Sequence, residues 1–217
     1  MLVAAAVCPD LPSLAGASDG DAPAAPERLR AACAEAVAAV LAAAPDLVAV
    51  VAPGPRTLLH PTGRADGDLP ASPGSGVGVG AALLRRAGWT GPVRAYEVDD
   101  DRSWPANGED GVHLAGWADR VALLALGNGP TRPDAGRTTG PDPRIAGLDA
   151  GIAAALACGD VDGWFPDLDA DLARELGVSG RSPWQLLDGA DEDLTTHRLL
   201  HTAAVDGTSC FVAVWTR

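Results

Sequence analysis

Lysine is absent from this 217-residue chain, whose sixteen basic residues are all arginines and are outnumbered by 29 acidic residues. The formal net charge is −13. Nucleic acids and anionic membrane surfaces are bound through basic patches, which so acidic a chain does not favour. We therefore expect neither a nucleic-acid partner nor a membrane partner, and we expect a cytoplasmic protein.

Aromatic residues are also scarce, at 4%, although 47% of the residues are hydrophobic. The apolar content is mostly Ala, Val and Leu, so the core needs helices packed closely on a sheet. No apolar run approaches the roughly 20 residues of a membrane-spanning helix. The length suits one large domain, and we expect a single α/β domain over residues 1–217.

Paired cysteine motifs are missing as well. The four cysteines, Cys8, Cys33, Cys158 and Cys210, are widely spaced and lie in apolar or Ala-rich surroundings. Neither a disulfide framework nor a zinc site has this pattern. The sequence therefore predicts buried free thiols.

Two short apolar runs organise the sequence. Residues 2–7 stop at Pro9 and Asp10, residues 47–52 stop at Pro53, and apolar residues recur at helical spacing over 26–44 between them. This pattern predicts a β-α-β unit with a right-handed crossover. We also expect strands at 92–98, 120–126 and 209–216, helices at 81–87, 143–158, 168–176, 183–187 and 194–201, and thus a mostly parallel central sheet flanked by helices.

Polar residues that follow these strands are the candidate site, because open α/β sheets bind ligands at the carboxyl ends of their strands. Asp10 follows the first strand directly, and His60 follows the second by eight residues. His113 comes before the strand at 120–126. We expect Asp10, His60 and His113 as a tentative metal set, His60 and His113 as catalytic residues, and a substrate pocket of Asp10, Pro12, Pro53, Gly54 and Asn128.

Two further patterns have ordinary structural explanations. Glycines at 74, 76, 78 and 80 resemble a dinucleotide-binding motif, but a long loop over 53–75 precedes them and a strand should. We expect a flexible loop that enters a helix. Asp193, His197 and His201 would share one helix face, yet its outer members would lie about 12 Å apart. Either His197 and His201 bind a metal as a pair, or they are solvated or capping residues.

The opening Val-Cys-Pro-Asp-Leu-Pro-Ser-Leu at residues 7–14 resembles the Cys-Pro-His-Pro-Pro-Leu-Leu opening of the class III extradiol ring-cleavage dioxygenase superfamily. The likeness is to the protocatechuate 4,5-dioxygenase beta-subunit type, and most of all to its small actinobacterial members. Segments 46–54, 172–185 and 211–215 also fit, and 124–132 looks like a Gly-Asp-Gly-Ser-Ala-Arg segment. The resemblance implies the family's α/β fold, and its active members cleave catechols with O₂ at an Fe(II) held by two His and one Glu.

The family's ligand positions do not carry over to this chain. Asp10 stands where the first His belongs, and His60 arrives late for the second. Asn128 replaces the acid of Gly-Asp-Gly, and the acids 191–193 and 206 are the only nearby candidates for the Glu. We expect a degraded or rebuilt metal site without standard catechol cleavage, in a homo-oligomer that binds a small-molecule ligand. The alternative is an active non-haem Fe(II) dioxygenase for a catecholic or related aromatic substrate, with His60 or His113 as general base.

Overall fold

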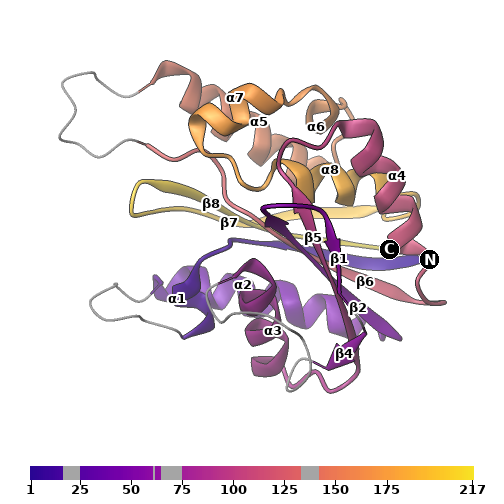
Figure 1. The fold of residues 1–217 in the computed structure, drawn as a ribbon. Coiled ribbons are helices and arrows are strands. Elements are labelled where there is room, and N and C mark those ends of the chain that lie inside the picture. Colours follow the sequence, from indigo (N-terminus) through magenta and orange to yellow (C-terminus); the bar gives the residue numbers. More distant parts are fainter. Residues whose placement is uncertain (17–24, 61, 65–74, 133–141) are drawn as a thin grey trace.

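The computed structural model describes residues 1–16, 25–60, 62–64, 75–132 and 142–217. Over these residues the chain is a single α/β domain, in which one sheet of eight strands has helices on both faces (Figure 1). Neighbouring strands follow the order β3-β5-β2-β6-β1-β8-β7, and β4 pairs with β5. The strands are β1 (Leu2–Cys8), β2 (Leu47–Gly54), β3 (Leu58–Leu59), β4 (Gly63–Arg64), β5 (Pro92–Asp99), β6 (Val121–Leu126), β7 (Thr196–Val205) and β8 (Thr208–Thr216).

The sheet is mixed, and only its centre is parallel. Strands β5, β2, β6 and β1 run parallel to one another. Strand β8 lies antiparallel beside β1, with Val7 opposite Ala213, and β7 lies antiparallel beside β8. The short strands β3 and β4 are antiparallel to β5. The expected α/β fold is confirmed, and the expected mostly parallel sheet is corrected to a parallel centre with antiparallel flanks.

Helices form one layer on each face of the sheet (Figure 1). Side chains of β2 alternate between the two layers, as they must in a strand. Val48 and Val50 pack in the lower core, and Ala49 and Val51 pack in the upper one. The lower layer is α1 (Pro12–Ala15), α2 (Glu27–Ala42) and α3 (Gly76–Arg86), and the upper layer is α4 (Trp104–Ala115), α5 (Pro143–Cys158), α6 (Trp164–Asp167), α7 (Ala170–Leu176) and α8 (Arg181–Ala190).

The glycine run forms the first turns of α3, so the expected flexible loop is wrong for residues 76–80, while Gly74 lies outside the described residues. Ser75 caps the helix, since its Oγ accepts a hydrogen bond from Gly78 N at 3.2 Å. A Cβ atom on Gly76 or Gly80 would lie 2.6 Å from a side chain of β2. These glycines therefore let α3 lie close against the sheet, which explains the run without a nucleotide.

The helix expected at 194–201 is wrong, because this segment is the edge strand β7. The residues Asp206 and Gly207 have φ values of 48° and 80° and turn the chain back into β8. His197 packs edge-on against Trp215, with ring centroids 4.9 Å apart. The helical face proposed for Asp193, His197 and His201 therefore does not exist.

The segment 103–111, which reads as a loop, is mostly helical. It belongs to α4, which packs against α8 through buried Asn107, Gly108 and Gly111. The side chain of Asn107 donates a hydrogen bond to Gln185 Oε1 at 3.0 Å. Tertiary contacts with α8 thus stabilise a helix whose own composition favours a turn.

Other sequence expectations have mixed outcomes. All four cysteines are free, and Cys8, Cys33 and Cys210 are buried as expected, whereas Cys158 is exposed on α5. A hydrogen bond with the neighbouring thiol of Cys33, together with burial, raises the pKa of Cys8. Among the described residues, no helix combines the length and the apolar character needed to cross a membrane.

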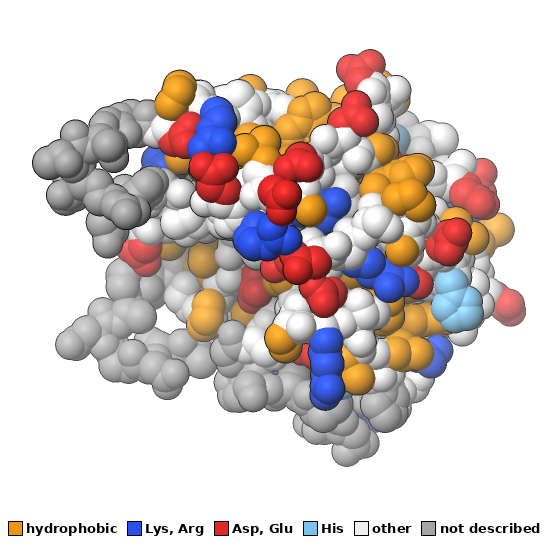
Figure 2. All heavy atoms as spheres, turned by 45° about the horizontal axis from the view of Figure 1, so that its top comes forward, with side chains coloured by type: hydrophobic (Ala, Val, Ile, Leu, Met, Phe, Trp, Pro, Cys, Tyr) orange, Lys and Arg blue, Asp and Glu red, His pale blue; other side chains and the backbone are white. Residues whose placement is uncertain are grey.

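The upper face carries acidic and basic side chains side by side (Figure 2). Arg144 forms ion pairs with Asp142 and Glu175 at 2.7 and 2.6 Å. The hydrogen bonds from Arg144 lower the pKa of Asp142 to about 2. Exposed ion pairs of this kind each contribute little to stability, and they are a common feature of protein surfaces.

Candidate functional site

The central strands β1 and β6 lie next to each other, but the helices that follow them lie on opposite faces of the sheet. Strand β1 continues into α1 and α2 of the lower layer, whereas the helix after β6 is α5 of the upper layer (Figure 1). In open α/β sheets, ligands bind at such topological switch points, beyond the carboxyl ends of the strands. The candidate site is therefore the edge where β1 and β6 end.

Asp10 and Asn128 meet at this edge, as the sequence predicts. Asp10 N donates a hydrogen bond to Asn128 Oδ1 at 3.1 Å, and Asn128 Nδ2 donates to Asp10 O at 3.0 Å. The main chain of Asn128 is held by the two residues just before α8: its N donates to Ser179 Oγ at 3.0 Å, and its O accepts from Gly180 N at 2.9 Å. Asn128 thus joins the ends of two strands to the start of a helix.

The carboxylate of Asp10 lies at the first turn of α3. A Cβ atom built on Gly76 would lie 3.1 Å from Asp10 Oδ2. The other oxygen, Oδ1, is buried and accepts no hydrogen bond within the described part of the chain. Burial raises the pKa of Asp10 to about 6. A buried carboxyl group without a partner, with a pKa close to neutral pH, is typical of a functional site.

The other members of the expected pocket lie around this centre. Pro12 is exposed and begins α1 two residues after Asp10. Pro53 and Gly54 end β2, and only β6 lies between β2 and β1. Two strand spacings place them about 10 Å from the end of β1 along the edge. The residues of the expected substrate pocket therefore share the carboxyl edge of the sheet. Among them, Asn128 is the residue that forms hydrogen bonds with Asp10.

His60 is not brought to Asp10. Its main-chain N donates to Ala95 O at 2.9 Å, beside β3 at the far end of the sheet. Its ring is buried, with Nε2 lying 3.3 Å from Glu97 Oε2. Four strand spacings separate β3 from β1, or about 19 Å at the usual spacing of strands. The ring therefore lies beside Glu97 and too far away to share a metal ion with Asp10.

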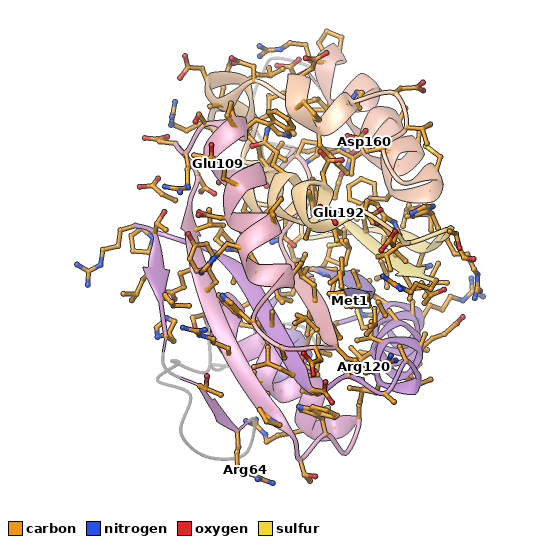
Figure 3. The ribbon with its side chains drawn as sticks, turned by 90° about the vertical axis from the view of Figure 1, so that its right-hand side faces the viewer. Met1, Arg64, Glu109, Arg120, Asp160 and Glu192 are labelled. Atoms are coloured by element: carbon orange, nitrogen blue, oxygen red, sulfur yellow. The ribbon has the colours of Figure 1, made fainter. Side chains whose placement is uncertain are left out.

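His113 is also apart from Asp10. It is exposed in the last turn of α4, which leads towards the amino end of β6. Figure 3 shows this side of the molecule, where Met1 and Arg120 lie. The amino group of Met1 donates to Ala118 O at 3.1 Å here. Asp10 lies at the opposite edge, so the structure does not assemble the expected metal set.

Elsewhere in the described part of the chain, acidic and thiol side chains do not replace that set. Within the described ranges, no three His, Cys, Asp or Glu side chains come together in a way that could hold a metal ion. His197, for example, faces Asp191 with Nε2 3.3 Å from Oδ2, but a tight pair supplies only two ligands.

Sequence reasoning missed the residues that fix this edge from the upper layer. Arg181 is only 5% exposed, and its guanidinium donates to the main-chain oxygens of Leu168, Asp100 and Arg102. Ser182 Oγ donates to Asp99 O at 3.0 Å. These bonds tie the end of β5 to the start of α8. The Ser-Gly-Arg-Ser segment at 179–182 could have indicated these contacts, because its small and basic residues interrupt the apolar pattern of the neighbouring helices.

Comparisons with known proteins support the fold over almost the whole chain. No protein-family model matches the sequence, and no curated protein matches it either. The structure is similar to the crystal structure of uncharacterized protein JW3007 from Escherichia coli K12, with a TM-score of 0.59 and 16% sequence identity. The match covers 99% of this chain and 100% of that one. At this identity the likeness establishes a shared fold, and it assigns no family.

Replacing Asn128 by aspartate should destabilise the protein by about 1–3 kcal/mol, the usual cost of leaving a buried polar group without its partner. The new carboxylate would place an acceptor against Asp10 O, which now accepts a hydrogen bond from Asn128 Nδ2. Urea unfolding near neutral pH measures the change. Asn128→Ala is the control, because it removes both bonds without adding charge and so measures the cost of the lost hydrogen bonds alone. Equal stability of Asn128→Asp and wild type would contradict the role of this amide.

Proposed function

We propose that this protein is a class III extradiol dioxygenase-like protein that binds a small molecule at the switch point without the family's iron. The observation that carries the proposal is the carboxyl group of Asp10, whose Oδ1 is buried and unpartnered among the described residues. The resemblance in sequence supports the family, and the near-complete match in fold to another α/β protein is compatible with it.

The donors present do not fit the iron that the resemblance implies. Iron of this kind needs two imidazoles and one carboxylate around a single point. Asp10 supplies a carboxylate, but the His60 ring lies beside Glu97 and His113 lies at the other edge of the sheet. The protein's own chemistry at this edge is therefore that of a carboxyl group and an amide.

A carboxyl group with a pKa of about 6 can accept a hydrogen bond when it is ionised and can donate one when it is protonated. The ligand that suits it carries a hydroxyl or amino group, which would bond to the carboxyl group of Asp10. By the resemblance, we propose a catecholic or related aromatic molecule. Asp10 would bind and orient it, and Asn128 would hold the Asp10 main chain in place.

The first test is the metal content of protein purified without oxygen, measured again after Fe(II) addition and desalting. We expect far less than one iron per chain in both samples. We also expect catechol to raise the melting temperature of the wild type, because a ligand that binds the folded state stabilises it. Near-stoichiometric iron together with catechol cleavage would overturn the metal-free proposal and establish the active dioxygenase.

The second test locates the ligand. Asp10→Asn should abolish the catechol-induced shift in melting temperature, whereas Asp119→Asn should retain it. Asp119 is an exposed aspartate next to β6 at the amino edge, so it is a matched control for the change in charge. An unchanged shift in Asp10→Asn would show that catechol binds elsewhere.

A further inference from the structure

The lower layer contains a cavity that is separate from the Asp10 edge. It lies between α1, α2 and α3 and has a volume of about 640 Å³. Pockets that bind small molecules have volumes of about 300–1,000 Å³. Neither Asp10 nor Asn128 lines it. The cavity is therefore a second place at which this protein could bind a ligand.

The inner wall of the cavity is apolar. Four buried side chains from its three helices form that wall, and they are Leu14, Cys33, Val37 and Leu83. The outward-facing wall of α2 is made of alanines, which leave the space open and include exposed Ala34. Such a surface gains free energy when it is covered by an apolar group.

Two arginines line the same cavity. Arg86 is exposed at the end of α3, and its guanidinium donates to Leu14 O, which ties α1 to α3. Arg30 lies on α2 with its Nη2 2.5 Å from Oε2 of Glu27, whose side chain is 82% exposed. Among the described lining residues, two guanidiniums stand against one carboxylate, so this part of the lining is positive on a chain whose net charge is −13. Arginine also matches the geometry of a carboxylate, which it can bind through two hydrogen bonds.

We propose that the α1–α2–α3 cavity binds a small organic carboxylate with an apolar body. The apolar body packs against Leu14, Val37 and Leu83, and the carboxylate bonds to Arg30 and Arg86. The attraction of opposite charges favours an anion over a cation of the same length, and the apolar wall favours a chain over a bare ion. This site does not depend on the ligand proposed for Asp10.

Calorimetric titration with decanoate, below its micelle concentration, tests the proposal. We expect saturable binding at one decanoate per chain, and at least about tenfold weaker binding of decyltrimethylammonium. Acetate, which has the same head without the chain, should not bind. Absence of saturable binding up to about 1 mM decanoate would overturn the site, and so would equal affinity for the cation.

Variants locate the binding. Ala34→Trp fills the cavity from an exposed position and should abolish decanoate binding. Ala42→Trp makes the same change at an exposed position of α2 that does not line the cavity, and it should bind within about twofold of wild type. Arg30→Gln should weaken decanoate binding about fivefold or more, since an ionic hydrogen bond is lost. Undiminished binding in Ala34→Trp or Arg30→Gln would overturn the assignment of the cavity.

Discussion

Replacing Asp10 by asparagine should stabilise the protein above about pH 6 and change its stability little below about pH 4. Burial raises the pKa of this carboxyl group from 3.8 to about 6 in the folded state. Below pH 3.8 the group is neutral in both the folded and the unfolded chain. As the pH rises through 6, the folded state must ionise a buried group, and the stability that the bound proton provided is lost. Asparagine keeps the shape and never ionises.

The gain at about pH 8 should be at most about 3 kcal/mol, because the pKa shift is about two units and each unit corresponds to about 1.4 kcal/mol. For a chain of this length, that is an increase in melting temperature of up to about 10 °C. Urea unfolding at about pH 4 and about pH 8 measures both ends of the range. Asp119→Asn should show no such pH dependence.

A loss of stability in Asp10→Asn at high pH would contradict this account. It would mean that the first turn of α3 stabilises the ionised carboxylate more than burial disfavours it. A gain would mean that the protein retains a destabilising group at the switch point, which is common where a side chain is kept for function.

Gly111→Ala should destabilise the protein by about 3 kcal/mol or more, the upper range for overpacking a core. A Cβ atom on Gly111 would lie 2.2 Å from Leu186 O and 2.8 Å from Ala190 N. Both are main-chain atoms of α8, so no flexible side chain can move aside. Helices α4 and α8 would have to separate, and the upper core would open.

Gly108→Ala is the matched control, one turn earlier on α4. Among the described residues, and apart from the neighbouring backbone of α4 itself, a Cβ on Gly108 would meet only the Trp104 ring, at 4.0 Å. This variant should be neutral or more stable by roughly 0.5–1 kcal/mol, because alanine favours helices more than glycine does. Thermal unfolding of the two variants compares them directly. Similar stability of the pair would show that the α4–α8 contact is looser than the structure indicates.

The strands of the parallel centre could be predicted from sequence because each is a continuous apolar run between turn residues. The expected strand at 47–52 lies within β2, and the expected strand at 120–126 corresponds to β6. Buried strands covered on both faces have this pattern. The helix at 143–158 was predicted with the bounds of α5, since Pro143 and the residues after Cys158 limit it.

Edge and glycine-rich elements could not be predicted in the same way. The two histidines at 197 and 201 have helical spacing, but this segment forms hydrogen bonds with β8 in a hairpin. The Asp206-Gly207 pair is the signal that was overlooked, because Asp-Gly between two strands favours such a turn. Helix α4 was missed because Gly108 and Gly111 disfavour a helix, although a proline in its first turn favours one. Of the two glycines, Gly111 is explained by its close contact with the main chain of α8.

The sequence could predict those site residues that closely follow a parallel strand. Asp10 and Asn128 each follow a parallel strand within two residues, so adjacency of β1 and β6 brings them together. His60 and His113 are joined to their strands by longer segments, and sequence alone did not indicate which edge each would reach. The unpartnered Oδ1 of Asp10 depends on packing by α3 and is visible only in three dimensions.

The pairing of β1 with β8 has a consequence for how the chain folds. The first strand of the sequence lies between β6 and β8, so its two neighbours come from the middle and the far end of the chain. Contacts between such distant segments raise the contact order, which slows folding. During synthesis, β1 emerges before β6 and β8, and one of its edges stays open until β8 emerges. Until then β1 is an apolar strand with an unpaired edge, which is the kind of segment that tends to pair with other chains.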